Sequence, residues 1–473
     1  MGRTTRFLTF LLVLASCFCF SPAASAQTGV KTFTGALPDG ATYLIEVPAN
    51  WNKTLFLYSH GYVEPGAANP AADVGDPATR VFMLSSGYAL AGSSYASTGW
   101  AIQQAIPDQI AVLDIFRQTV GHPKRTIAWG HSLGGMVTAG LIQQHPERFD
   151  AALPMCGVVS GGVATWNTAL DSAFAFKTLL APGSGLQVVN ITTNPVTNLD
   201  ISEEFLNVAQ ATAQGRARIA LSAALGNLPG WFTPLSPEPA ATDYTSQEEN
   251  QFLWEQNVDF PFVFAFRAEL EARAGGNVSW NTGVDFRQQL AKSIDRAEVV
   301  ALYEAAGLDL DSDLEVLNRA ARISADPPAF EYLKQNITFD GDINIPVLTL
   351  HTKGDGLVVV ENESAYKHVV DEEGNGQLLR RDFIDRAGHC AFTPAETIAA
   401  VGKLIDRLDT GRWHEPTAAE LNAVATALGP AFNIFASGTT VVATPPAFID
   451  FIPGPYLRPF DLGDDRRGRG NPW

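Results

Sequence analysis

The sequence predicts an α/β fold: a mostly parallel central sheet, helices on both faces of it, and a mainly helical insertion. Strand-like apolar runs alternate with helical patterns before residue 160 and again after residue 341, and such alternation requires crossovers between parallel strands. In between the alternation stops, and 473 residues are enough for one core with a large insertion. We therefore expect an α/β core in residues 27–160 and 341–410, a helical lid in 161–340, and a C-terminal strap and tail in 411–473.

The N-terminus is expected to be a cleaved signal peptide, residues 1–26. A basic start precedes an apolar run over residues 7–15, and a small-residue cleavage site ends at Ala26. Residues 14–17 also resemble a lipobox, which would anchor the chain through a lipid on Cys17. Either alternative predicts a secreted or extracytoplasmic protein.

Composition narrows the classes of partner. The formal charge of −18 argues against nucleic acid or an anionic membrane surface. No later stretch is apolar and long enough to span a bilayer. The cysteines and histidines lack metal-ligand spacing, so we expect no metal site and no cofactor. Nothing in the sequence indicates the oligomeric state.

The first half of the core is expected to open with a hairpin, because Pro38-Asp39-Gly40 separates two strand-like runs. Residues 63–80 are rich in Pro, Gly, Ala and Asp and are expected to form a loop. Helical spacing predicts an amphipathic helix that starts near Pro107 and a second helix over 136–144. The predicted strands are 30–37, 42–47, 54–59, 88–94, 126–129 and 151–156.

The insertion is predicted to be helical over residues 202–225, 258–273, 286–307 and 311–323, with Pro/Gly-rich loops between these segments. Because it would leave the carboxyl edge of the sheet, it is expected to roof the active site. Its many aromatic residues are expected mainly to build its own small core: Trp166, Phe174, Phe176, Trp231, Phe232, Trp254, Phe260, Phe262, Phe264 and Phe266.

The alternation then resumes with predicted strands over 345–351 and 378–385 and helices over 363–370 and 394–408. Farther on we expect a short helix near 417–428. A Pro- and aromatic-rich strap over 445–459 is expected to lie on the body of the protein, and the charged tail 464–469 to be disordered.

The motif that indicates a catalytic function is Gly130-His131-Ser132-Leu133-Gly134, which lies between a predicted strand and a predicted helix. In that setting the serine takes a strained backbone conformation that exposes its hydroxyl. Side chains at Gly130 or Gly134 would collide with the neighbouring strand or helix. We therefore predict that Ser132 is a nucleophile.

A serine nucleophile needs a base, and the base needs an acid that orients it. Among the eight histidines we expect His389 to be the base, because its loop follows the last predicted strand and can approach Ser132. Asp355 lies in a tight turn after strand 345–351, at the same sheet edge, and is expected to be the acid. We expect Asp382 and Asp385 to lie in the next strand and face solvent. Glu361 and Glu363 have the positions of ordinary first-turn helix residues.

The tetrahedral intermediate of acyl transfer needs donors for its oxyanion. The backbone N–H of Leu133, directly after the nucleophile, is one candidate. The loop His60-Gly61-Tyr62 follows a predicted strand, and the N–H of Tyr62 is the second candidate. Gly61 would let this backbone approach the substrate closely.

Together these motifs resemble the α/β-hydrolase superfamily, over roughly residues 27–160 and 341–410. The order Ser132, Asp355, His389 is the order found in that superfamily. The resemblance implies a serine hydrolase with a lid domain, in which these three residues are nucleophile, acid and base.

Cleavage after Ala26 would leave Cys156 and Cys390, and an oxidising compartment favours one disulfide over two free thiols. His389-Cys390 is also similar to the His-Cys pair of the tannase and feruloyl esterase family, in which a disulfide ties the histidine loop near the serine. This chain departs from that pattern because position 131 is His rather than Cys. A paired Cys390 must therefore reach Cys156.

The first functional hypothesis is a secreted hydrolase of carboxylic esters, acting on a small molecule or a polymer. The second is a peptidase or amidase that resembles the proline-releasing aminopeptidases. The third is a non-catalytic binding relative, which the intact Ser, Asp and His set disfavours. The acids that could hold a free amino terminus in the second case are Glu203, Glu204, Glu248, Glu249 and Glu255.

Overall fold

We describe the fold from a computed structural model of the chain. The structure describes residues 29–437 and 440–460. The expected signal peptide, Cys17 and the charged tail 464–469 lie outside these residues. Within them, no helix combines the length and the apolar character that crossing a membrane requires.

The chain folds around a nine-stranded sheet in the order β1-β2-β4-β3-β5-β6-β7-β8-β11. Strands β3 to β8 are parallel to one another, whereas β2 pairs antiparallel with β4 and with β1 at one edge and β11 pairs antiparallel with β8 at the other. This confirms the predicted α/β class with a mostly parallel sheet. The strands are β1 (Lys31–Ala36), β2 (Thr42–Val47), β3 (Thr54–Ser59), β4 (Ala89–Ser93), β5 (Arg125–His131), β6 (Ala151–Met155), β7 (Val347–Gly354), β8 (Leu379–Ala387) and β11 (Phe448–Ile449).

Both faces of the sheet are buried, which explains why its central strands are continuous apolar runs. In β3, Leu55 and Leu57 join one apolar cluster and Phe56 and Tyr58 the other, as the alternation of side chains along a strand requires. The first cluster includes helices α3 (Ile102–Thr119), α4 (Leu133–Gln144) and α14 (Asn362–Glu372). The second includes α2 (Pro77–Ser85), α15 (Pro394–Thr410) and α16 (Ala418–Ala427).

Two helices of the core differ from the prediction. Helix α3 begins at Ile102 and contains Pro107, because burial of Ala105 and Ile106 outweighs the one helical hydrogen bond that proline removes. Helix α2 lies partly in the segment predicted to be a loop. Two residues in the sequence indicate the start of this helix. The Asp76 side chain accepts a hydrogen bond from Thr79 N, and Pro77 occupies the first helical position.

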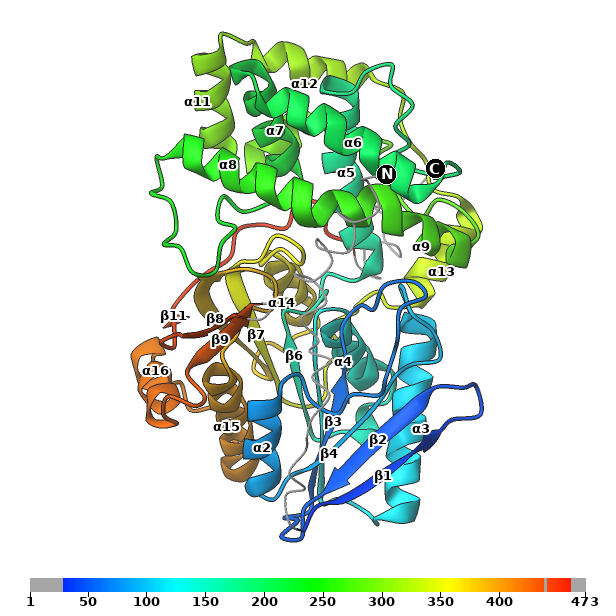
Figure 1. Ribbon diagram of the computed structural model, residues 1–473, viewed down its shortest axis with the longest axis vertical. Helices are drawn as coiled ribbons and strands as arrows, with labels where there is room; N and C mark the ends of the chain where they lie inside the picture. Colours follow the sequence, from blue (N-terminus) through cyan, green and yellow to red (C-terminus); the bar gives the residue numbers. More distant parts are fainter. Residues whose placement is uncertain (1–28, 438–439, 461–473) are drawn as a thin grey trace.

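Between β6 and β7 the chain forms a helical layer above the carboxyl edge of the sheet (Figure 1). We call residues 162–335 the cap. Its helices are α5 (Gly162–Leu179), α6 (Pro195–Gln210), α7 (Ala213–Leu225), α8 (Tyr244–Trp254), α9 (Arg267–Ala274), α10 (Phe286–Lys292), α11 (Arg296–Ala306), α12 (Leu310–Arg319) and α13 (Pro327–Gln335). Two π-helical segments, Glu255–Asp259 and Pro261–Phe266, connect α8 to α9.

Two predicted cap helices are each divided in the structure. Thr212 interrupts the first, because its side chain accepts a hydrogen bond from Gly215 N and starts α7. Ser293 interrupts the second: its backbone is extended, and its hydroxyl donates to Ala224 O. Helices α5, α8 and α13 were missed. Helix α5 is buried over most of its length and shows no polar face, and α13 is short and begins with two prolines, which are typical of a loop.

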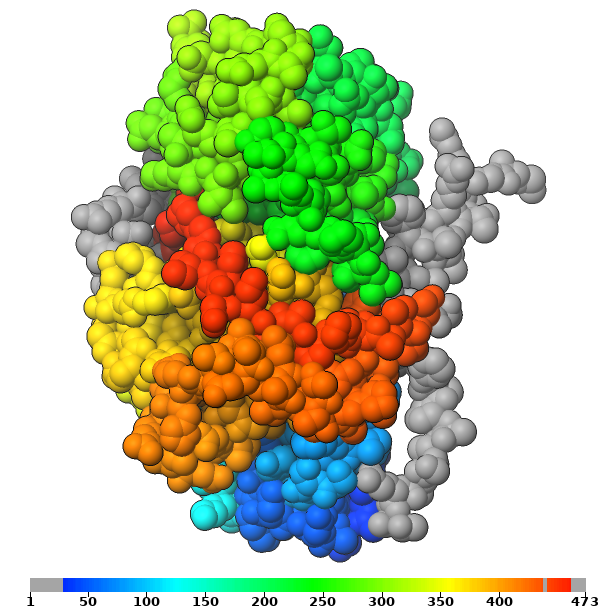
Figure 2. Space-filling model, turned by 90° about the vertical axis from the view of Figure 1, so that its left-hand side faces the viewer, coloured from blue at the N-terminus to red at the C-terminus, as the bar shows by residue number. Residues whose placement is uncertain are grey.

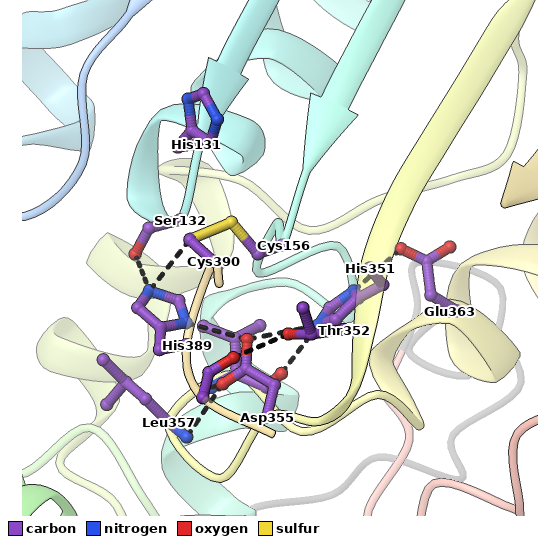
Figure 3. The surroundings of a disulfide bond; sticks show 12 residues. His131, Ser132, Cys156, His351, Thr352, Asp355, Leu357, Glu363, His389 and Cys390 are labelled. Carbon is purple, nitrogen blue, oxygen red and sulfur yellow. Dashed lines mark hydrogen bonds and ion pairs between the residues drawn. A yellow bond between two sulfur atoms is a disulfide. The ribbon is translucent and has the colours of Figure 1, made fainter. Parts of the chain in front are cut away.

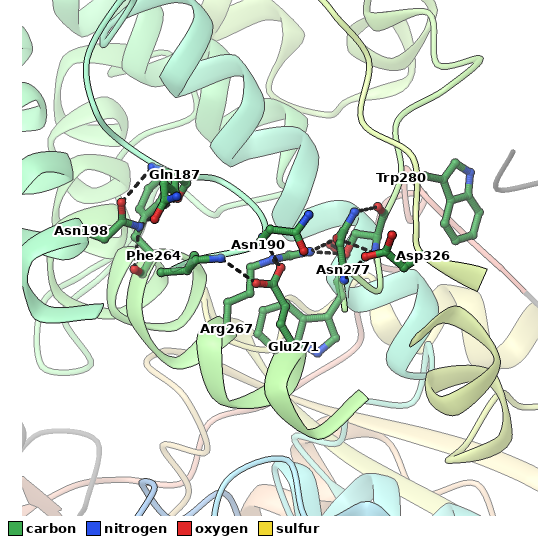
Figure 4. A network of polar contacts seen from close by, with 12 residues as sticks. Gln187, Asn190, Asn198, Phe264, Arg267, Glu271, Asn277, Trp280 and Asp326 are labelled. Atoms are coloured by element: carbon green, nitrogen blue, oxygen red, sulfur yellow. Dashed lines mark hydrogen bonds and ion pairs between the residues drawn. The ribbon is translucent and has the colours of Figure 1, made fainter. Parts of the chain in front are cut away.

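The cap has apolar clusters of its own, which include Phe176, Phe260 and Phe264 in one and Phe174 and Phe286 in another. The expected aromatic core is confirmed for these residues, but Trp166, Trp254 and Phe232 join the apolar cluster on one face of the sheet instead. Arg267 belongs to one network of polar contacts in the cap, shown in Figure 4.

The Arg267 side chain is fully buried. Its guanidinium donates to Glu271 at 2.8 Å, to Asn277 at 2.7 Å and to Ser279 at 3.0 Å. The Glu271 carboxylate also accepts from Asn190 N at 2.9 Å. These bonds pair the buried charge with a carboxylate through Nε and with two neutral side chains through Nη2, and they connect α9 to two loops of the cap.

The C-terminal segment 445–460, which we call the strap, joins core and cap. Strand β11 adds to the sheet beside β8, and Figure 2 shows the strap (red) crossing the surface from the core to the cap. There Arg458 donates to the Asp171 carboxylate of α5 at 2.5 Å and to Trp280 O at 2.9 Å. A separate hairpin, β9 (Ile434–Ser437) and β10 (Thr440–Ala443), was not predicted.

One predicted orientation in β8 is wrong. Asp382 was expected to face solvent, but it is buried and accepts from Lys403 of α15 at 2.6 Å. The ion pair lets an acidic residue point toward a helix that covers the sheet. Asp385 is 44% exposed, as expected.

Candidate active site

Ser132 lies at the sharp turn between β5 and α4. Its backbone angles, φ 60° and ψ −126°, lie in a region that L-residues rarely adopt. The turn is possible because its flanking residues are glycines. A Cβ at Gly134 would lie 1.9 Å from Ser59 O, and one at Gly130 would lie 2.5 Å from the same atom. The predicted collisions with the neighbouring strand are therefore confirmed.

The structure brings together the three residues that the sequence singled out, as Figure 3 shows. His389 Nε2 is 2.8 Å from Ser132 Oγ, and His389 Nδ1 is 2.8 Å from Asp355 Oδ2. The geometry suits a base that accepts the serine proton at Nε2 while the carboxylate fixes its other nitrogen.

The Asp355 carboxylate is fully buried and well supplied with donors. The backbone N–H groups of Leu357 and Val358 both donate to Oδ1 at 3.0 Å. Burial raises the pKa of Asp355, but His389 and His351 outweigh burial and hold that pKa below its ordinary value. Asp355 is therefore a carboxylate at neutral pH.

The acid and histidine loops are tied to each other. Thr352 donates its hydroxyl to Gly388 O at 2.7 Å, and Gly388 N donates to Gly354 O at 2.9 Å. The disulfide expected between Cys156 and Cys390 is present, and it joins the end of β6 to the residue after His389. These connections fix the imidazole relative to the sheet edge.

The loop after β3 lies directly beside the serine. A Cβ at Gly61 would lie 3.3 Å from Ser132 Cβ and 3.8 Å from Ser132 Oγ. His60 is buried, with Nε2 3.0 Å from Ser94 O and its ring stacked on Tyr95. Burial lowers the pKa of His60, which suits a role in holding this loop. Leu133 is the first residue of α4, so its N–H is one that a helix cannot satisfy internally.

Two residues near the acid were not assigned to the site from the sequence. His351 lies in β7, and its Nδ1 is 3.0 Å from Glu363 Oε1 at the start of α14. Its Nε2 is 3.6 Å from Asp355 Oδ2. One feature of the sequence could have indicated His351. It is the first ionisable residue of β7, in which the only other ionisable residue is Lys353, and it lies four residues before Asp355.

The cap covers this edge of the sheet. Trp254 lies against the acid loop, where a Cβ at Gly356 would be 2.2 Å from its ring. Phe262 and Phe266 of the second π-helical segment contact the Tyr62 ring, with centroids 5.1 and 5.9 Å apart. π-Helical turns are frequent at functional sites. Aromatic residues of the cap therefore contact both the loop after β3 and the acid loop.

Among residues 29–437 and 440–460, no three or more His, Cys, Asp or Glu side chains lie close enough together to hold a metal ion.

Comparisons with known proteins identify the family of the chain. The o-phthalyl amidase of Xanthobacter agilis is 31% identical over 435 residues, which cover 86% of this chain and 94% of that protein. The chain belongs to the family of this amidase, within the α/β-hydrolase superfamily of serine hydrolases. The Prolyl oligopeptidase family profile matches residues 88–178, which include Ser132.

Solved structures with a similar fold include two esterases. The rice cell wall degrading esterase LipA from Xanthomonas oryzae is 15% identical, with 81% of this chain and 90% of that chain covered and a TM-score of 0.35. An esterase from Aspergillus oryzae is 12% identical, with 90% and 88% covered and a TM-score of 0.42.

Proposed function

We propose that this member of the amidase family cleaves carboxylic amides and esters through an acyl-enzyme on Ser132. The observation that carries the proposal is the unbroken relay from Ser132 Oγ to His389 and Asp355, with both contacts at 2.8 Å. In this proposal His389 Nε2 takes the serine proton as Oγ attacks the carbonyl carbon. The same proton then goes to the leaving amine or alcohol.

The oxyanion of the intermediate would be bound by the backbone N–H groups of Leu133 and Tyr62. This proposal rests on the position of Leu133 at the start of α4 and on the closeness of Gly61 to Ser132. The partial positive charge of the helix N-terminus favours the same oxyanion. Water would resolve the acyl-enzyme by the reverse sequence, with His389 as the base.

The sequence favours an ester as the substrate, but the relative with 31% identity is an amidase. We therefore place amides of an o-phthalyl group first and esters second. The half-buried aromatic side chains of Phe262 and Phe266, which contact the Tyr62 ring, support an aromatic acyl group. The cap would act as the lid of this site, with core and insertion divided as the sequence predicts.

A peptidase that holds a free amino terminus is the weaker candidate. Glu204 and Glu249 are exposed, whereas Glu248 and Glu255 are buried in the cap. Burial raises the pKa of Glu248 to about 7 and that of Glu255 to about 8. At neutral pH Glu248 is therefore about half protonated and Glu255 mostly protonated, and both attract an ammonium group less than a full carboxylate does.

We also propose that the protein is exported. A disulfide beside the histidine loop is compatible with an extracytoplasmic compartment.

The test is a matched panel of o-phthalyl amides, p-nitrophenyl esters and aminoacyl-nitroanilides, measured with the protein and with Ser132→Ala. We expect turnover of the first two classes and a loss of at least about 10⁴-fold in kcat in the variant. Faster turnover of the nitroanilides would favour the peptidase. Equal turnover by Ser132→Ala would contradict the proposed nucleophile.

A further inference from the structure

A second buried histidine lies behind the proposed catalytic acid. His351 is in β7 and is fully buried. Its Nδ1 lies 3.0 Å from Glu363 Oε1, and its Nε2 lies 2.8 Å from Val358 O. In Figure 3 the ring is seen between Glu363 and Asp355.

These partners determine the charge of the ring. Glu363 also accepts a hydrogen bond from the Thr349 hydroxyl at 2.6 Å, so each carboxylate oxygen has a donor when His351 Nδ1 carries a proton. Val358 O can only accept, so Nε2 carries a proton too. Burial alone would lower the pKa of His351, but Asp355 and Glu363 outweigh burial and raise it to about 10. His351 is therefore an imidazolium at neutral pH.

His60 shows that burial beside acceptors is not sufficient for this charge. Its ring nitrogens lie 2.8 Å from Gly61 O and 3.0 Å from Ser94 O, and both partners are neutral carbonyls. Burial lowers the pKa of His60. The difference lies in the two carboxylates beside His351.

The charge of His351 acts on one oxygen of the catalytic relay. Asp355 Oδ2 lies 2.8 Å from His389 Nδ1 and 3.6 Å from His351 Nε2. We propose that His351, held by Glu363, is a positioning residue that places a buried positive charge beside Asp355 and keeps it a carboxylate while it orients His389. This inference rests on the proposed function, because it assigns His351 a part in the same reaction.

The consequence is electrostatic. A cation near Asp355 opposes transfer of the Nδ1 proton of His389 to the carboxylate when Nε2 takes the serine proton, so both ring nitrogens stay protonated and Nε2 can give its proton to the leaving group. The same cation disfavours a second positive charge on the neighbouring His389 ring. Other titratable groups interact with these residues and remain unchanged in the test: Glu361, Asp259, Arg381, Tyr366 and His131.

The first test is the pH profile of kcat/KM for His351→Gln. The variant removes a unit charge whose Nε2 lies 3.6 Å from Asp355 Oδ2, and this should move the acid limb of the pH profile upward by about one pH unit. The value of kcat/KM should then fall about tenfold at pH 6 and less at pH 8.5. His368→Gln, an exposed histidine on α14, is the matched control and should keep the original profile. A loss that is equal at every pH, or an unshifted acid limb, would overturn the proposal.

The second test does not require the variant to fold. With ¹⁵N-histidine labelling of the unaltered protein, NMR should find one ring with two protonated nitrogens up to about pH 9, well above the range in which an imidazole ordinarily loses its proton. If every ring is neutral by pH 8, His351 is not the cation and the proposal is wrong. Activity retained in Ser132→Ala would instead remove the proposed function, and the NMR result would still report the charge of His351.

Discussion

Asp355→Asn is expected to lower kcat about 10⁴-fold, and the contacts of Asp355 explain why. Oδ1 accepts from Leu357 N and Val358 N. The asparagine oxygen must take that place, because an NH₂ group there would face two buried donors at a cost of about 1–3 kcal/mol each. The NH₂ group then faces His389 Nδ1. This nitrogen must become the acceptor, so Nε2 holds the proton and donates to Ser132.

A base in that tautomer cannot accept the serine proton. The expected loss of about 10⁴-fold corresponds to about 5 kcal/mol of transition-state stabilisation. Steady-state kinetics on the best substrate of the panel would measure it, with KM expected to change by less than about threefold. Asp385→Asn is the matched control, because Asp385 is on the adjacent strand and half-exposed. The reasoning is refuted if Asp355→Asn keeps more than a tenth of kcat, or if Asp385→Asn loses as much.

Three further predictions concern neighbouring features. Gly61→Ala should lower kcat by about 10- to 100-fold, because the new Cβ would displace the loop beside Ser132 by a few tenths of an ångström. The free energy of unfolding should fall by less than about 1 kcal/mol. Kinetics and urea unfolding of the same sample measure the two effects separately. The unfolded, unreduced protein should contain no free Cys156 or Cys390 thiol by thiol titration, and replacing both by alanine should lower the free energy of unfolding by about 3–5 kcal/mol. Stability should fall as pH rises from about 4.5 to 8, because burial raises the pKa of Glu255 to about 8, so the native state keeps a proton that the unfolded chain releases. Glu255→Gln should flatten this dependence by up to about 1.4 kcal/mol per pH unit between urea titrations at pH 5 and 7.5, and an unchanged slope would contradict the assignment.

The positions of Ser132, Asp355 and His389 could be inferred because each follows a strand of the parallel part of the sheet. The carboxyl ends of such strands meet at one edge, so chain order and strand pattern were enough to place the three side chains there. Gly130 and Gly134 indicated the sharp turn at Ser132, because the backbone of β3 approaches them too closely for a residue with a side chain.

The features that were missed depend on tertiary contacts. Helix α3 tolerates Pro107 because its apolar face is buried, and β11 is a strand only because β8 offers it an edge. The partnership of His351 with Glu363 joins a strand to the helix that follows it, and an acid in the first turn of a helix is too common to indicate it.

The strap has a consequence for protein engineering. Arg458 provides the buried partner of Asp171, a residue of the cap, although it lies after the core in the chain. A chimera that exchanged residues 162–335 alone would leave this arginine against a foreign surface and deprive it of its carboxylate. Attempts to alter the substrate range by grafting the cap of a homologue must therefore transplant two separate stretches of sequence together, the cap and the strap.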